Sequence, residues 1–281
     1  MEHPDIWFYN LNISFNNIDT VAFTIFGISI FWYGIIIVTA VCAGYLVAAR
    51  EAKRTGQKVE TYSDLLLYVL ITSVIGARLY FIAFSDALTM ADFFDFRSGG
   101  LAIYGVVFAA IPTAIIFAKR KKINQWQLMD TGIFGLITGQ IIGRWGNFIN
   151  REAFGSFTDN IFAMRLRVDQ LAFLPYQLTD TIINVDGVEY VQVHPTFFYE
   201  SMLNLGLLGF MHFHKHNKKF HGEILMVYFI GYGTVRAVLE TLRVDSLMIG
   251  PLRTSVLASI VLVTLGIYGM WYGRKNGKLG K

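Results

Sequence analysis

Seven long apolar segments are the feature that most limits what this chain can fold into. They cover residues 23–49, 65–84, 101–118, 128–143, 196–213, 223–239 and 254–272. A helix needs roughly 20 mostly apolar residues to span a bilayer, and somewhat fewer where it begins in a cavity lined by protein. With 54% hydrophobic and 16% charged residues, the composition excludes an ordinary water-soluble globule. The sequence predicts an all-α integral membrane protein with seven transmembrane helices, in which 1–281 is a single membrane domain.

Every lysine lies in one of four basic clusters, which follow the first, third, fifth and seventh apolar segments. The clusters occupy residues 50–58, 119–122, 215–219 and 274–281. Because positive residues in short loops favour the cytoplasmic side of a membrane, the C-terminus and these loops are expected in the cytoplasm. The N-terminus is then outside. The net charge of only +4 gives no indication of nucleic-acid binding.

The other arginines lie in the apolar segments or on the outer side. They are Arg78, Arg97, Arg144, Arg151, Arg165, Arg167, Arg236, Arg243 and Arg253. A planar guanidinium holds a phosphate or carboxylate at two points, which an ammonium group does less well. The outer half therefore looks suited to an anion. The alternative is that these arginines extend to the interface or form structural ion pairs.

Residues 153–193, between the fourth and fifth apolar segments, are the longest outer stretch. They predict a small extracytoplasmic head inserted into the membrane domain. Within it, Ile183 to Val193 reads as two short strands around an Asp186-Gly187 turn, which is a strong β-hairpin signal.

The first polar cluster is residues 143–155, Gly-Arg-Trp-Gly-Asn-Phe-Ile-Asn-Arg-Glu-Ala-Phe-Gly. If the fourth helix continues through it, Gln140, Arg144, Asn147 and Arg151 share one face. Glycines at 135, 139 and 143 form a stripe for close helix approach below it. A polar helix end packed by small residues is the structural alternative.

The second cluster is a polar ladder in the sixth segment, formed by Tyr228, Tyr232, Arg236, Glu240 and Arg243. Their spacing puts Glu240 within reach of both arginines. Two arginines to one carboxylate leave a positive charge that an anion could balance. A self-contained ion ladder that stabilises the bundle is the alternative.

The third cluster, residues 97–105, opens the third segment with Arg-Ser-Gly-Gly-Leu-Ala-Ile-Tyr-Gly. A helix start rich in glycine offers free N–H groups to an anion. Elsewhere, His194 is a candidate base, phosphate donor or helix cap, and Glu200 needs a partner because a carboxylate is costly within a span. Tyr33 reads either as an interfacial anchor or as a site residue.

Several common types of catalytic or metal site have no support in the sequence. The motifs of a serine hydrolase, a zinc protease and a phosphate-binding loop do not occur. Cys42, the single cysteine, lies in mid-span, where thiolate formation is unfavourable. No ligand set implies a metal or organic cofactor. The residues alone therefore indicate an outward-opening arginine site for a lipid phosphate or another anion.

The motifs resemble those of the prolipoprotein diacylglyceryl transferases. The run from Gly143 to Glu152 followed by Gly155 resembles the family signature. Four further motifs occur in family order: Trp32-Tyr33-Gly34, Gly76-Ala77-Arg78, the Gly99–Gly105 run and the His194–Glu200 run. Arg236, Glu240 and Arg243 also match in spacing.

The resemblance implies transfer of a diacylglyceryl group from phosphatidylglycerol to the lipobox cysteine of a prolipoprotein signal peptide, at the outer face of a bacterial cytoplasmic membrane. It implies a thioether product and release of glycerol 1-phosphate. Arg144 and Arg236 would stabilise the leaving phosphate. By resemblance, the other catalytic positions are Tyr104, Asn147, Glu152 and Glu240, and the other substrate-binding positions are Tyr33, Arg78, Gly99, Gly100, Gly105, Gly155, His194 and Arg243.

The chain departs from the family at Tyr104-Gly105-Val106, where many members have His followed by two glycines. A tyrosine has an ordinary pKa of about 10 and is a poor base at neutral pH. The base therefore remains open among Tyr104, His194, a carboxylate and the phosphate itself. An anion or lipid transporter that uses the same arginines is the alternative function.

Overall fold

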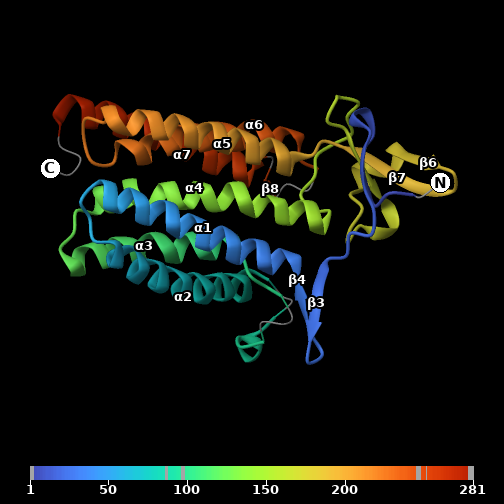
Figure 1. The fold of residues 1–281 in the computed structure, drawn as a ribbon, viewed down its shortest axis with the longest axis horizontal. Coiled ribbons are helices and arrows are strands. Elements are labelled where there is room, and N and C mark those ends of the chain that lie inside the picture. The colour runs from blue at the N-terminus through green and yellow to red at the C-terminus, as the bar shows by residue number, and fades with distance from the viewer. Residues whose placement is uncertain (1–2, 86–87, 96–98, 245–247, 251, 278–281) are drawn as a thin grey trace.

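The computed structural model describes residues 3–85, 88–95, 99–244, 248–250 and 252–277. It shows a long helical bundle with a small β-rich head at one end (Figure 1). The α-helices of the described ranges are α1 (Trp32–Arg54), α2 (Val59–Phe84), α3 (Ile103–Lys121), α4 (Gln125–Asn150), α5 (Thr196–His214), α6 (Glu223–Leu242) and α7 (Thr254–Asn276). Five of them, α1, α2, α3, α6 and α7, are long and apolar enough to cross a membrane. The protein is therefore a mostly helical, multi-pass membrane protein.

Helix α4 lies inside the bundle, where it packs against α1, α3, α5 and α6. Its predicted glycine stripe faces α1. A Cβ on Gly135 would lie 2.6 Å from the carbonyl oxygen of Gly44, so the backbones approach too closely for any larger residue. Gly139 and Gly143 have ordinary spacing to α1. Close approach is thus confirmed at one position of the stripe.

The head is built on an antiparallel sheet of five strands in the order β2-β1-β5-β7-β6. These strands are β1 (Ile6–Phe8), β2 (Ile13–Phe15), β5 (Met164–Arg167), β6 (Ile182–Val185) and β7 (Val188–Val193). The predicted hairpin is confirmed: Val185 pairs with Val188 around Asp186 and Gly187, which both have positive φ. The sheet also contains two N-terminal strands, which the expected head of 153–193 does not include.

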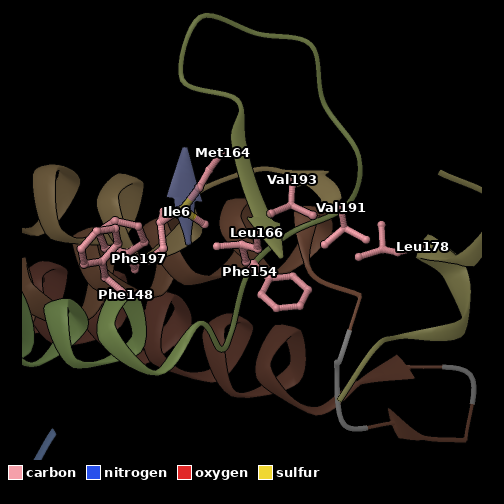
Figure 2. Packing of buried hydrophobic residues seen from close by; sticks show 9 residues of the cluster. All are labelled: Ile6, Phe148, Phe154, Met164, Leu166, Leu178, Val191, Val193 and Phe197. Carbon is pink, nitrogen blue, oxygen red and sulfur yellow. The ribbon is translucent and has the colours of Figure 1, made fainter. Parts of the chain in front are cut away.

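The core of the head joins this sheet to the adjacent ends of α4 and α5. Ile6, Leu166 and Val191 are buried together with Phe148 of α4 and Phe197 of α5 (Figure 2). Because the side chains of the sheet pack closely on those of α4 and α5, the head has little freedom to move relative to the ends of these two helices.

The structure of residues 21–31 differs from the first predicted span. The first span is expected to begin at Phe23, but residues 21–31 form the β-hairpin β3 (Val21–Ile25) and β4 (Ile28–Phe31). Phe26 and Gly27 make its turn with φ of 49° and 76°. β-branched residues favour strands, and a short apolar run does not by itself distinguish a strand from a helix. The helical prediction is therefore wrong for this segment, and the head contains a five-stranded sheet, which extends the expected hairpin.

The predicted basic clusters gather at the end of the bundle opposite the head (Figure 1). There Lys215 binds the buried Glu51 of α1 at 2.7 Å, and Lys218 binds Asp130 of α4 at 3.1 Å. Lys278 and Lys281 of the last cluster, and Arg97, lie outside the described residues. The remaining short strands, β8 (Met248–Ile249) and β9 (Leu252–Arg253), form a small hairpin before α7.

Candidate active site

Two arginines from different helices meet on one carboxylate near the end of the bundle that carries the head. Arg144 of α4 donates from Nη2 to Oε1 of Glu200 in α5 at 2.7 Å, and Arg236 of α6 donates from Nη1 to Oε2 of Glu200 at 2.9 Å. The side chain of Glu200 is 3% exposed, whereas that of Arg144 is 23% exposed. Because a buried carboxylate is costly without charged donors, the contact fixes all three side chains relative to one another.

Glu240 binds the other side of Arg236, as its spacing in α6 predicts. Its Oε2 accepts from Nη2 of Arg236 at 2.8 Å. Arg243 follows the end of the helix, where its N–H donates to the carbonyl of Glu240 at 3.3 Å and its backbone forms a bridge with Gly155. Glu200 supplies a second carboxylate, so the positive charge of Arg236 is compensated from both sides. The excess positive charge that the sequence predicts for this ladder is therefore not found at Arg236.

Asn147 and Glu152 extend this network towards the surface. Arg144 donates to Oδ1 of Asn147 at 3.3 Å, and the amide of Asn147 donates to Oε1 of Glu152 at 2.8 Å. We call the resulting chain of Glu152, Asn147, Arg144, Glu200, Arg236 and Glu240 the arginine–carboxylate network. Five of the six residues assigned as catalytic by resemblance thus lie in one network, and Tyr104 is the exception.

The polar ladder of α6 continues the site inward. Gln140 donates to the hydroxyl of Tyr228 at 2.8 Å, which links α4 to α6 below the arginines. The rings of Tyr228 and Tyr232 stack with centroids 5.2 Å apart. The polar ladder of α6 thus contacts α4 through Tyr228 and α5 through Arg236, whereas Arg243 lies beyond the end of the helix.

Arg151 does not share the face of Arg144, contrary to the expectation of a continuous helix. Helix α4 ends at Asn150, and Arg151 adopts a left-handed backbone with φ of 52°. Its guanidinium instead reaches the N-terminal segment, where Nη2 donates to the carbonyl of Ile18 at 2.6 Å.

An open cleft of about 570 Å³ lies beside the network. Its lining residues are Ser29, Ile30, Phe31, Tyr33, Gly34, Gly99 and Asn150. Tyr33 packs its ring on α4, since a Cβ at Gly146 would be 2.7 Å from Cδ2 of Tyr33. Asn150 donates to Oε1 of Glu152 at 3.5 Å, which connects the cleft to the network. Tyr33 and Gly99, two of the expected substrate-binding residues, therefore line one cleft.

Arg78 lies elsewhere and is fully buried. It donates to the carbonyl groups of Asp92 at 2.6 Å, Asp95 at 2.6 Å and Phe93 at 3.2 Å, and also to those of Gly99 and Gly100. Each donor therefore binds the backbone of the loop before α3. The structure places Arg78 as the support of that loop, and thereby of Gly99 in the cleft.

Tyr104 and Gly105 belong to the contact between α2 and α3. The ring of Tyr104 packs on Tyr80 with centroids 6.2 Å apart, and Gly105 touches the backbone of Gly76. Because the described contacts of Tyr104 are on this helix pair, the structure does not join it to the arginine–carboxylate network.

His194 and Gly155 lie where the head meets α5 and α6. Nδ1 of His194 is 3.3 Å from the amide of Asn160 and 3.4 Å from the hydroxyl of Tyr199. Gly155 donates to the carbonyl of His194 at 3.0 Å. Burial lowers the pKa of the His194 imidazole, so this side chain is neutral at pH 7.

Glu200 is the main site residue that the sequence analysis did not assign. Its signal was present, because a carboxylate inside an apolar segment requires a partner. Which partner it takes depends on the packing of α4, α5 and α6. Within the described ranges, no three His, Cys, Asp or Glu side chains are grouped to hold a metal ion.

Comparisons with known proteins agree with the motifs. Residues 20–272 match the model of the family described as prolipoprotein diacylglyceryl transferase. The phosphatidylglycerol--prolipoprotein diacylglyceryl transferase of Finegoldia magna is 40% identical over 89% of this chain and 93% of its own. The enzymes of the same name from Clostridioides difficile and Bacillus cereus are 39% and 38% identical over 92% and 94% of this chain, and cover 97% and 95% of their own lengths. The chain therefore belongs to the prolipoprotein diacylglyceryl transferase family.

Proposed function

We propose that this protein transfers the diacylglyceryl group of phosphatidylglycerol to the lipobox cysteine of a prolipoprotein. The cysteine sulfur forms a bond to the glyceryl carbon while the bond from that carbon to the phosphate oxygen breaks. Glycerol 1-phosphate leaves with the electron pair of the broken bond, and the thiol proton passes to a base. The names of the relatives supply the two substrates.

The convergence of Arg144 and Arg236 on Glu200 is the observation that carries the proposal. The negative charge that develops on the leaving phosphate is stabilised best by donors held in place beforehand. Glu200 and Glu240 hold Arg236 from two sides. Arg144 is the more exposed of the two arginines, with 23% against 12% of its side chain accessible. We therefore assign the first phosphate contact to Arg144 and the supporting charge to Arg236.

The cleft beside Asn150 and Tyr33 is proposed as part of the lipid-binding region. It is lined on one side by the apolar hairpin β3–β4 and on the other by the end of α4. Arg78 holds the loop that carries Gly99 and Gly100. Gly155 and Arg243 bridge at the junction of the head with α6, and Gly105 permits the close contact of α2 with α3. The thiol base stays open among His194, a carboxylate, Tyr104 and the phosphate itself.

We also propose that all seven helices span the bacterial cytoplasmic membrane, with the head of 153–193 outside. Helix α4 has 26 residues and α5 has 19, so at about 1.5 Å per residue α4 is longer than the roughly 30 Å of a hydrocarbon core and α5 nearly reaches that length. The lysine clusters at the opposite end support a cytoplasmic C-terminus. The arginine–carboxylate network would then face outward.

The test is transfer by the purified protein in phosphatidylglycerol vesicles to a lipobox peptide. The expected product is a peptide whose mass increases by one diacylglyceryl group, with loss of product in Arg144→Ala and Arg236→Ala. Arg120→Ala, at an exposed position on the opposite end, serves as control. Full activity of both network variants would exclude a role of Arg144 and Arg236 in stabilising the leaving phosphate. Movement of lipid between leaflets without any modified peptide would favour a transporter.

A further inference from the structure

The N-terminal segment precedes residues 20–272, which match the family, yet it contacts Arg151, the neighbour of Glu152 in the arginine–carboxylate network. Asp5 is 7% exposed. Its Oδ2 accepts from the N–H of Ile18 at 2.8 Å, and its Oδ1 accepts from the amide of Gln170 at 2.7 Å. Asp5 also lies 3.6 Å from Nη2 of Arg151 and 3.7 Å from Nη1 of Arg167. This buried carboxylate thus joins the N-terminal segment to the head.

Arg151 completes the contact from the other side. Its side chain is 5% exposed, and its Nη2 donates to the carbonyl of Ile18 at 2.6 Å. Asp5 therefore binds the N–H of Ile18 while Arg151 binds its carbonyl. Ile18 lies just before β3, so the two side chains together fix the root of the hairpin that lines the cleft. We call Asp5, Ile18 and Arg151 the N-terminal clamp.

The clamp acts on a stretch of unfavourable backbone. Arg151 and Ala153, on either side of Glu152, have φ of 52° and 54°. Residues with a Cβ adopt this left-handed conformation rarely, and they keep it only where surrounding contacts hold them. The backbone N–H of Arg151 caps α4 by donating to the carbonyl of Phe148 at 3.2 Å, and its side-chain contacts are those of the N-terminal clamp. The carbonyl of Ala153 accepts from the hydroxyl of Thr196. Glu152 between them accepts from Asn147 at 2.8 Å.

We propose that Asp5 is a positioning residue, which holds Arg151 in its left-handed conformation and thereby sets Glu152 against Asn147. The role rests on the proposed function, in which Glu152 belongs to the site. Asp5 itself touches no substrate. Its removal leaves the buried guanidinium of Arg151 without its carboxylate, so that the turn relaxes and Glu152 moves.

The substitution Arg151→Gly distinguishes this positioning role from simple anchoring of the N-terminal segment. Glycine adopts positive φ without a steric penalty and carries no charge to be paired. Arg151→Gly is therefore expected to keep transfer activity within about threefold of the wild type, while Arg151→Ala, which loses the clamp but retains a Cβ, loses about tenfold or more. Asp5→Ala is expected to lose about tenfold or more in the wild-type background, because small displacements in a site are costly.

The decisive variant is the double substitution Asp5→Ala with Arg151→Gly. If Asp5 acts through the backbone of Arg151, the double variant is about as active as Arg151→Gly alone. A merely structural N-terminal anchor predicts that the two losses add. Activity and thermal unfolding are both measured on purified protein, so that unfolding of a variant is distinguished from displacement of Glu152 in a folded one. Additive losses, full activity of Asp5→Ala, or equal damage by Arg151→Gly and Arg151→Ala would each overturn the proposal.

Two further variants complete the test. Asp169→Ala removes an exposed carboxylate that binds Arg167 at 2.6 Å, and it is expected to leave activity unchanged. Glu152→Gln tests the site itself. If Glu152→Gln is inactive but Asp5→Ala is active, only the positioning role of Asp5 is overturned. If Glu152→Gln is active, the proposed role of Glu152 is overturned, and with it the positioning role of Asp5.

Discussion

The carboxylate of Glu200 binds Arg144 at 2.7 Å and so joins α5 to the helix that carries the family signature. Its second oxygen binds Arg236 at 2.9 Å. One residue thus sets the separation of the two arginines that we assign to the leaving phosphate.

Replacing this carboxylate by its amide is expected to abolish most activity. In Glu200→Gln the side chain keeps its size, but its NH2 group repels one guanidinium and leaves positive charge uncompensated. We expect transfer to the lipobox peptide to fall by about 100-fold or more. Glu189→Gln, the same change at an exposed position of β7, is the control. Near-normal transfer by Glu200→Gln would show that the arginines do not depend on this carboxylate.

Lysine in place of either arginine is expected to restore only part of the activity lost with alanine. An ammonium retains the charge but cannot bind two partners in the planar arrangement that Arg236 makes with Glu200 and Glu240. Loss of one charge-assisted hydrogen bond corresponds to about 1.5–3 kcal/mol, or about tenfold to 100-fold in rate. The measurement is kcat/KM for Arg144→Lys and Arg236→Lys against the alanine variants. Arg120→Lys should match the wild type, and equal rates for lysine and arginine at the site would exclude a geometric role.

Gly155→Ala is expected to destabilise the junction of the head with α5 and α6. The new Cβ would lie 2.8 Å from Cβ of His194 and 2.9 Å from the carbonyl oxygen of Leu242. Overpacking of this kind costs about 1–3 kcal/mol, measured as a lower thermal unfolding temperature in detergent. Gly209→Ala in α5 is the matched control, because no atom lies within 4 Å of its Cβ and the helix gains propensity. Equal stability of the two variants would contradict the tight junction.

Stability is expected to fall in acid partly through His194. Burial lowers the pKa of its imidazole below the ordinary value of 6.5, so the folded protein binds fewer protons here than the unfolded chain. The stabilisation is therefore present above about pH 6.5 and is lost as the pH falls through the lowered pKa. Thermal unfolding of His194→Gln should depend less steeply on pH below 6.5 than that of the wild type. His216→Gln, at an exposed position, should keep the wild-type slope.

The sequence by itself determined the features that depend on local physics. Apolar length predicts the helices, lysine distribution predicts a basic end, and Asp186-Gly187 predicts the turn between β6 and β7. The spacing of Arg236 and Glu240 likewise predicts their contact, because residues four apart meet on one helix face.

Only the tertiary structure decided the contacts between segments far apart in the chain. Glu200 could have paired with any buried donor, and the packing of three helices selects Arg144 and Arg236. The apolar run at 21–31 fits a strand or a helix, and its turn at Phe26-Gly27 makes it a hairpin. Arg151 continues a helical pattern in sequence, yet it caps α4 in a left-handed conformation and its side chain contacts Ile18. Such choices depend on side chains that folding brings together, and no local pattern contains them.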